Sequence, residues 1–264
     1  MDRRALFIDV DGTLLDSAHR LRPRTVRALR AANEQGHVIV IASGRCVDGI
    51  RSIVHELGFP VFLSSLNGAY VVDDAMGVIS SSPFPKEDAS LAARLIAEHG
   101  LGHLYFCDGE WGSGNASDYE LEAAVVKVEG LHLPLEEVIA TRPVHKILAV
   151  GDQDGDDLKS FLDQARGLLP GYMIMPSSSI YIEMNTPGTS KGRAIGEVCA
   201  YLGMSTGSSI AFGDWDNDIS MFDAAGWAVC MSNGSDCAKA HADEIALSND
   251  DDGLAIWVET HLIP

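Results

Sequence analysis

The chain has 264 residues, of which 46% are hydrophobic, and it carries 38 acidic against 19 basic side chains for a net charge of −19. This charge excludes nucleic acid and anionic membranes as partners, because like charges repel. The length favours two domains, since a single core seldom supports more than about 250–300 residues.

No stretch approaches the length of a membrane span, and Asp9 and Asp11 interrupt the first apolar run. We therefore expect neither a transmembrane helix nor a signal peptide. The five cysteines are odd in number and form no C-x-x-C pair, which is typical of reduced thiols. These features together predict a cytoplasmic protein.

The first predicted strand covers residues 5–10 and carries Asp9 and Asp11 at its end. Strand alternation would point both carboxylates the same way, and Gly12 permits a sharp turn after them. Such a pair suits phosphoryl transfer, with one carboxylate as nucleophile and the other handling a proton. Taken alone, the motif is equally consistent with a strand followed by a polar turn.

The second strand, 37–42, is a β-branched run typical of a buried parallel strand, and Ser43 and Gly44 follow it. Ligands bind at this end of open α/β sheets. A hydroxyl, an unobstructed amide and the start of the next helix could all contact a phosphoryl group there. An ordinary strand-to-helix turn is the alternative.

A lysine opens the helix predicted to run from about 190 to 202. The helix macrodipole disfavours a cation at this end, so Lys191 is expected to interact with a nearby anion. A solvated lysine is the alternative.

A strand near 209–213 ends in an acidic loop before another helical pattern. The loop carries Asp214, Asp216, Asn217 and Asp218. Hard oxygen ligands at this density favour Mg²⁺. A calcium loop is excluded, because Ile219 stands where its glycine belongs and Ala225 where its glutamate belongs.

The pattern along the chain predicts an α/β fold. Strands 5–10, 37–42 and 61–64 alternate with helices 23–35 and 46–57, followed by a hairpin around 73–77 and a linker at 83–85. A second α/β segment is expected from 84 to 184, with helices 86–98 and 154–168 and strands 103–107, 145–150, 172–175 and 180–184. The lysine helix, the acidic loop and a closing helix near 258–260 complete the first domain.

These motifs in this order resemble the haloacid dehalogenase superfamily of phosphatases, in its Cof-like (type IIB) branch. The stretch 65–69, Ile182-Glu183 and the segment 251–254 add to the likeness. The resemblance implies a Rossmannoid, doubly wound parallel sheet with an inserted α/β cap. The core would comprise 1–83 and 185–264, and the cap 84–184.

The resemblance also implies roles for the motif residues. Asp9 would be the nucleophile, and Asp11 the general acid and then base. Ser43 and Lys191 would hold the phosphoryl group. The metal set would be Asp9, Asp11 (through its carbonyl), Asp214 and Asp218, the last also supporting the loop. Phosphate or substrate would further contact Val10, Gly44, Arg45 and Asn217.

Candidates for the cap lining are polar and aromatic side chains: Asp108, Glu110, Trp111, Asn115, Tyr181 and Glu183. The loop 108–115 could reach the substrate or could be a glycine-rich connector. His99 and His103 are not expected to bind zinc, because Gly100 and Gly102 between them make a helical zinc pair improbable. The acidic run 152–157 is expected to be a solvated turn and helix cap.

The sequence therefore predicts a Mg²⁺-dependent phosphomonoester hydrolase with an aspartyl-phosphate intermediate. Its partner would be a small phosphorylated metabolite, with sugar phosphates foremost and nucleotide or cofactor phosphates also considered. The alternatives are a phosphotransferase or phosphomutase, and a non-catalytic sugar-phosphate sensor. A monomer or weak homodimer is expected.

Overall fold

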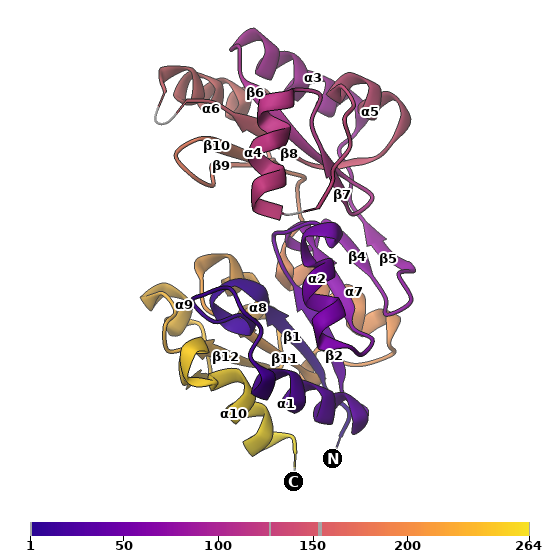
Figure 1. Cartoon of the computed structure of the whole chain (residues 1–264), viewed down its shortest axis with the longest axis vertical. Coiled ribbons are helices and arrows are strands. Elements are labelled where there is room, and N and C mark those ends of the chain that lie inside the picture. The colour runs from indigo at the N-terminus through magenta and orange to yellow at the C-terminus, as the bar shows by residue number, and fades with distance from the viewer. Residues whose placement is uncertain (1, 127, 153–154, 264) are drawn as a thin grey trace. The chain divides into compact units, whose positions relative to one another are not determined.

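The computed structural model describes residues 2–126, 128–152 and 155–263. The chain divides into two compact units, and Figure 1 labels many of their elements. Unit 1 comprises Met1–Gly44, Ile50–Ser80 and Ser190–Pro264, and unit 2 comprises Arg45–Gly49 and Ser81–Thr189. The division falls near the predicted boundaries at 83 and 185, whereas the assignment of unit 2 as a cap stays a prediction.

Unit 1 is built on one sheet whose strand order is β13-β12-β11-β1-β2-β3-β4-β5. Its strands are β1 (Ala5–Asp9), β2 (Val38–Ala42), β3 (Phe62–Ser65), β4 (Tyr70–Val72), β5 (Val78–Ser81), β11 (Ser209–Gly213), β12 (Trp227–Met231) and β13 (Glu244–Ala246). Every pairing from β13 to β3 is parallel, and β4 runs antiparallel to β3. Because the order reverses beside β1, the carboxyl ends of β1, β2 and β11 meet at a topological switch point.

Helices cover both faces of this sheet. One face packs against α7 (Lys191–Tyr201), α8 (Ile219–Ala224) and α9 (Asp236–Ala240), using alternate strand residues such as Phe7, Val40 and Ala211. On the other face Trp257 of α10 (Gly253–His261) packs edge-to-face on Phe212, with ring centroids 5.1 Å apart, and α10 lies against α1 (Pro23–Glu34). The predicted doubly wound parallel sheet is confirmed.

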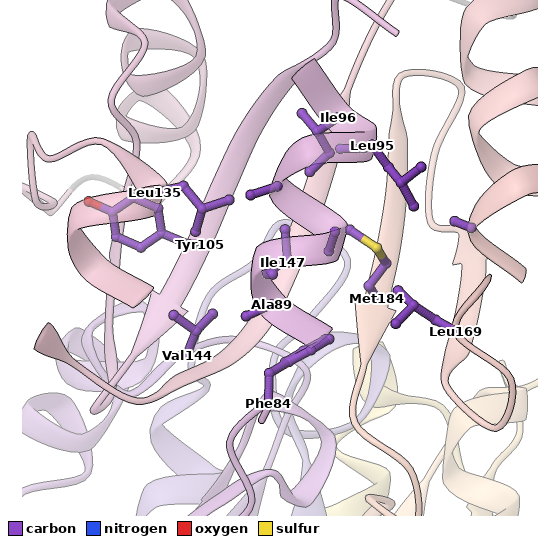
Figure 2. Close-up of a cluster of buried hydrophobic side chains, with 14 of the residues drawn as sticks. Phe84, Ala89, Leu95, Ile96, Tyr105, Leu135, Val144, Ile147, Leu169 and Met184 are labelled. Carbon is purple, nitrogen blue, oxygen red and sulfur yellow. The ribbon is translucent and has the colours of Figure 1, made fainter. Parts of the chain in front are cut away.

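Unit 2 has an antiparallel sheet with the strand order β7-β6-β8-β10-β9. Its strands are β6 (Gly102–Cys107), β7 (Glu110–Gly112), β8 (Val144–Val150), β9 (Met173–Pro176) and β10 (Tyr181–Asn185). Figure 2 shows the core that covers one face, in which Tyr105, Ile147 and Met184 of the strands meet the helices. These helices are α3 (Lys86–Glu98), α5 (Leu135–Thr141) and α6 (Asp156–Leu168).

The structure adds elements that the sequence did not predict. They are β7, α4 (Ala116–Val126) and α5 in unit 2, and β12, α9 and β13 in unit 1. The predicted helix 154–168 begins at Asp156, and residues 153 and 154 of the acidic run lie outside the described residues. The predicted helix 46–57 is α2 (Val47–Leu57).

All five cysteines are free thiols. Among the helices that the structure describes, none has both the length and the apolar character needed to cross a bilayer.

Candidate active site

Three strand ends bring the predicted site residues to one edge of the unit 1 sheet. Asp9 is the last residue of β1, Ser43 directly follows β2, and Asp214 directly follows β11. All three side chains are at least nine-tenths buried. Three residues that the sequence predicts at strand ends thus lie at the switch point, and their roles stay predictions.

The chain turns out of the sheet directly after Asp9. Residues Val10–Leu14 form a helical turn in which Gly12 has a φ of +83°. The prediction that strand alternation orients Asp9 and Asp11 alike is wrong, because the strand ends at Asp9. The Asp11 side chain is 46% exposed, and its carboxylate lies 3.4 Å from Nδ1 of His19.

Lys191 lies inside the protein and joins two carboxylates. Its Nζ donates to Oδ1 of Asp9 at 2.5 Å and to Oδ1 of Asp218 at 2.6 Å, and its side chain has no exposed surface. The alternative of a solvated lysine is thereby excluded. The first residue of α7 thus places an ammonium against the last residue of β1.

Asp218 holds the acidic loop in shape. Its Oδ2 accepts hydrogen bonds from the backbone N–H groups of Asp214, at 2.9 Å, and Trp215, at 3.1 Å. With Oδ1 engaged by Lys191, both oxygens of this fully buried side chain have partners. This geometry matches loop support, while membership of Asp218 in the metal set stays a prediction.

Thr13 contacts Asp214, and Asn233 holds the turn beside it; the sequence predicted neither role. The hydroxyl of Thr13 donates to its Oδ1 at 3.2 Å. Nδ2 of Asn233 donates to the carbonyl of Gly12 at 2.9 Å. This bond links the loop after β12 to the turn after β1. The available signal was position, since Asn233 follows a buried strand just as Asp214 does.

Three buried carboxylates, Asp9, Asp214 and Asp218, have oxygens within 4.8 Å of one another. Burial raises the pKa of Asp9 to about 8, although the Lys191 charge opposes this, and burial raises the pKa of Asp214 to about 6. Burial would lower the pKa of Lys191, but the carboxylates of Asp9 and Asp218 outweigh it and raise that pKa. Three carboxylates against one ammonium leave the cluster short of positive charge.

The remaining predicted site residues differ in burial and in the unit to which they belong. Val10 and Ser43 are buried, and a side chain at Gly44 would meet the amide of Asn67 at 3.2 Å. Asn217 is exposed on the short helical turn Asp216–Asp218. Arg45 belongs to unit 2, so its role at the phosphate stays a prediction.

The prediction that Trp111 is among the residues lining the cap is wrong. Its indole is fully buried inside unit 2, stacks on Tyr119 and donates from Nε1 to the carbonyl of Val128 at 3.2 Å. Glu110 forms an ion pair with Arg142. The segment predicted as a loop at 108–115 includes strand β7, which buries Trp111.

The chain is similar in sequence and in structure to known hydrolases and phosphatases. A family model described as haloacid dehalogenase-like hydrolase matches residues 6–258. A putative phosphatase of Haemophilus influenzae is 30% identical over 97% of each chain, and pyridoxal phosphate phosphatase YbhA of Escherichia coli is 29% identical over the full length of both. The crystal structure of a haloacid dehalogenase-like hydrolase from Bacteroides thetaiotaomicron is 29% identical, with a TM-score of 0.88 over 98% of this chain and 99% of that one.

Proposed function

The chain belongs to the haloacid dehalogenase-like hydrolases, as a phosphatase of their Cof-like branch, and from this we propose that it is a Mg²⁺-dependent phosphomonoesterase that works through an aspartyl-phosphate. One observation carries the proposal: Asp9 lies at the switch point, buried and held by Lys191 beside two further buried carboxylates.

The donor set fits a magnesium ion. Asp9, Asp214 and Asp218 supply oxygen donors, the ligand type that Mg²⁺ prefers. When all three are ionised, their negative charges exceed the single charge of Lys191 by two, which a divalent cation would balance. We assign Asp9 and Asp214 to the metal, together with the backbone carbonyl of Asp11. When bound, the ion would neutralise charge on the phosphoryl oxygens.

The first chemical step falls to Asp9. A carboxylate oxygen attacks phosphorus, the bond from phosphorus to the ester oxygen breaks, and Asp11 gives a proton to the departing oxygen. Lys191 orients Asp9 and offers its charge to the transferring group. The Ser43 hydroxyl and the Gly44 amide would donate hydrogen bonds to the phosphoryl oxygens from the β2 side.

The second step releases phosphate. Asp11, now ionised, takes a proton from water, whose oxygen attacks phosphorus and frees the Asp9 carboxylate. The half-exposed position of Asp11 suits this exchange with solvent, because its carboxylate must meet both leaving group and water. Val10, Asn217 and Arg45 complete the proposed phosphate and substrate contacts.

We propose small phosphorylated metabolites as substrates, with sugar phosphates foremost. Unit 2, an α/β insertion in the chain, would act as the cap that selects the leaving group. The relative named for pyridoxal phosphate makes cofactor phosphates the main competing class. We propose a cytoplasmic setting on the sequence features given above.

The test is phosphate release from sugar, nucleotide and cofactor phosphates, measured with Mg²⁺ and with chelator. We expect metal-dependent hydrolysis that Asp9→Asn abolishes. Transfer to a sugar acceptor in place of water would indicate a phosphotransferase, and binding without turnover would indicate a sensor. Either result would overturn the hydrolase proposal.

A further inference from the structure

Unit 1 has a cavity at the edge of its sheet opposite the candidate active site. Ile210 of β11, Trp227 of β12 and Glu244 of β13 line it, and they lie at the amino ends of these parallel strands. Four residues of extended strand, about 13 Å, separate Ile210 from Asp214 at the carboxyl end. The cavity volume is about 470 Å³, within the range of about 300–1,000 Å³ typical of small-molecule sites. The cavity can therefore hold a small molecule away from the carboxylate cluster.

Two tryptophan side chains give this cavity flat apolar walls. Trp227 is the first residue of β12 and is 44% exposed, whereas Trp257 of α10 is only 6% exposed. The ring of His261 stacks on Trp257, with centroids 4.2 Å apart and an interplanar angle of 18°. Aromatic rings pack well against such flat surfaces. The walls therefore favour a planar aromatic ligand.

Burial leaves the indole N–H of Trp257 in need of an acceptor. Its Nε1 is buried and has no hydrogen-bond partner among the residues that the structure describes. A tryptophan N–H can only donate, and a buried one usually has a partner. Because Trp257 forms part of the cavity wall, an acceptor atom on a bound ligand would supply the missing partner.

His261 and Glu244 bring two acceptor atoms to the same cavity. Nδ1 of His261 donates to the carbonyl of Trp257 at 2.8 Å, so Nε2 of the neutral ring is an acceptor. Oε1 of Glu244 lies 4.0 Å from this Nε2, too far for a hydrogen bond between the two. A ligand amino group has two N–H donors and would give one to each acceptor. The pair therefore suits an amino group.

The charges at the cavity disfavour a charged ligand. Arg4 also lines the cavity, so its positive charge balances the negative charge of Glu244. The Arg4 guanidinium makes one long hydrogen bond, from Nη1 to the carbonyl of Gly207 at 3.4 Å. A phosphorylated compound would bring further negative charge beside Glu244, whereas a neutral ligand would not.

We propose that this cavity is a second binding site of unit 1, for a neutral planar heterocycle with an amino group beside a ring nitrogen, as in adenine and cytosine. The amino group would donate to Glu244 and His261, and the ring nitrogen would accept from Trp257. The ring would stack on Trp227. This site needs neither metal nor phosphatase chemistry, so the inference stands apart from the proposed function.

The experiment measures dissociation constants for adenine and for purine, which lacks only the amino group, by NMR titration of the full chain. We expect adenine to bind one site with a dissociation constant of about 1 mM or tighter, and purine to bind about 10-fold more weakly. Glu244→Met should bring the two constants to within about 3-fold of each other, because it removes an acceptor for the amino group. Glu98→Met, at an exposed glutamate of α3 in unit 2, should keep the wild-type ratio.

Trp227→Ala should weaken adenine and purine alike by about 10-fold, because it removes stacking and leaves the polar groups in place. Thermal unfolding confirms that each variant is folded, and either folded variant alone carries the test. Adenine binding that is unchanged in Trp227→Ala, or equal binding of adenine and purine by the wild type, would overturn the inference. It would also fail if neither adenine nor cytosine binds. Phosphate release tests the proposed function separately.

Discussion

Gly12 lies so close to Asp214 that a Cβ atom at position 12 would stand 2.2 Å from Oδ2 of that carboxylate. The turn after β1 and the loop after β11 thus meet at a point where only a glycine fits. Because φ at Gly12 is +83°, the same position also favours glycine for backbone reasons. The contact fixes the separation between the nucleophile's turn and the carboxylate proposed to hold the metal.

Gly12→Ala should therefore displace Asp214 and lower kcat/KM by about 100-fold, as a misplacement near 1 Å can. The matched control is Gly36→Ala, since Gly36 has a φ of +92° but nothing within 4 Å of its would-be Cβ. It should cost about 1–2 kcal/mol of stability from the left-handed backbone alone and leave kcat/KM unchanged. Equal losses of kcat/KM in both variants would show that backbone strain, and not the contact with Asp214, causes the loss of activity.

Lys191→Met should destabilise unit 1 and abolish catalysis. The change leaves buried carboxylates without their ammonium, a loss of about 3–5 kcal/mol for a broken buried pair. The free energy of unfolding is measured by denaturant titration in chelator. Lys159→Met, at a side chain 68% exposed, should stay within about 0.5 kcal/mol of wild type. An equally stable Lys191→Met would mean that the carboxylates are protonated and need no cation.

Mg²⁺ should raise the melting temperature of unit 1, because an ion that binds only the folded state stabilises it by about 2.7 kcal/mol at one hundred times its dissociation constant. Asp214→Asn should remove most of this shift. Asp216→Asn, two residues along the same loop, should keep it, because the Asp216 side chain lies outside the carboxylate cluster and accepts from Ser235. An equal Mg²⁺ shift in both variants would contradict the proposed metal set.

Acid should destabilise unit 2 through His145. Burial lowers the pKa of this fully buried histidine to about 4, below its usual 6.5. Because the unfolded state binds the proton first, the stabilisation from neutral His145 is present above pH 6.5 and is lost as the pH falls toward 4. The loss is at most about 3 kcal/mol.

Unfolding of unit 2 measured between these pH values should show this slope in the wild type and lose it in His145→Gln. The control is His55→Gln, at an exposed histidine of α2, which should keep the slope. A slope that survives in His145→Gln would assign the pH dependence to other groups.

The unit 1 sheet could be predicted from sequence because its parallel strands are buried on both faces. Runs such as Val38–Ala42 are continuously apolar and end in polar residues, which also locates the site edge. Asp11 could not be placed in this way, since the turn that ends β1 packs closely against Asp214, which is far away in the sequence. Asn233 was missed because β12, the buried strand that it follows, was itself not predicted.

Unit 2 was less predictable. The glycines around Trp111 predict an exposed aromatic side chain in a loop. Its indole instead packs against Gly130, where an added Cβ would lie 2.6 Å from Cε2 of Trp111. That contact needs the intervening helix α4, whose mixed apolar and acidic residues lack a clear helical period.

The most direct test of the central claim is chemical trapping of the phosphoenzyme. Protein mixed with labelled acetyl phosphate and Mg²⁺ is quenched in acid, and the label is mapped by peptide mass spectrometry. The account predicts label on Asp9, more of it in Asp11→Asn because water attack is slowed, and none in Asp9→Asn. Steady phosphate release without label on Asp9, or by Asp9→Asn itself, would contradict the aspartyl-phosphate mechanism.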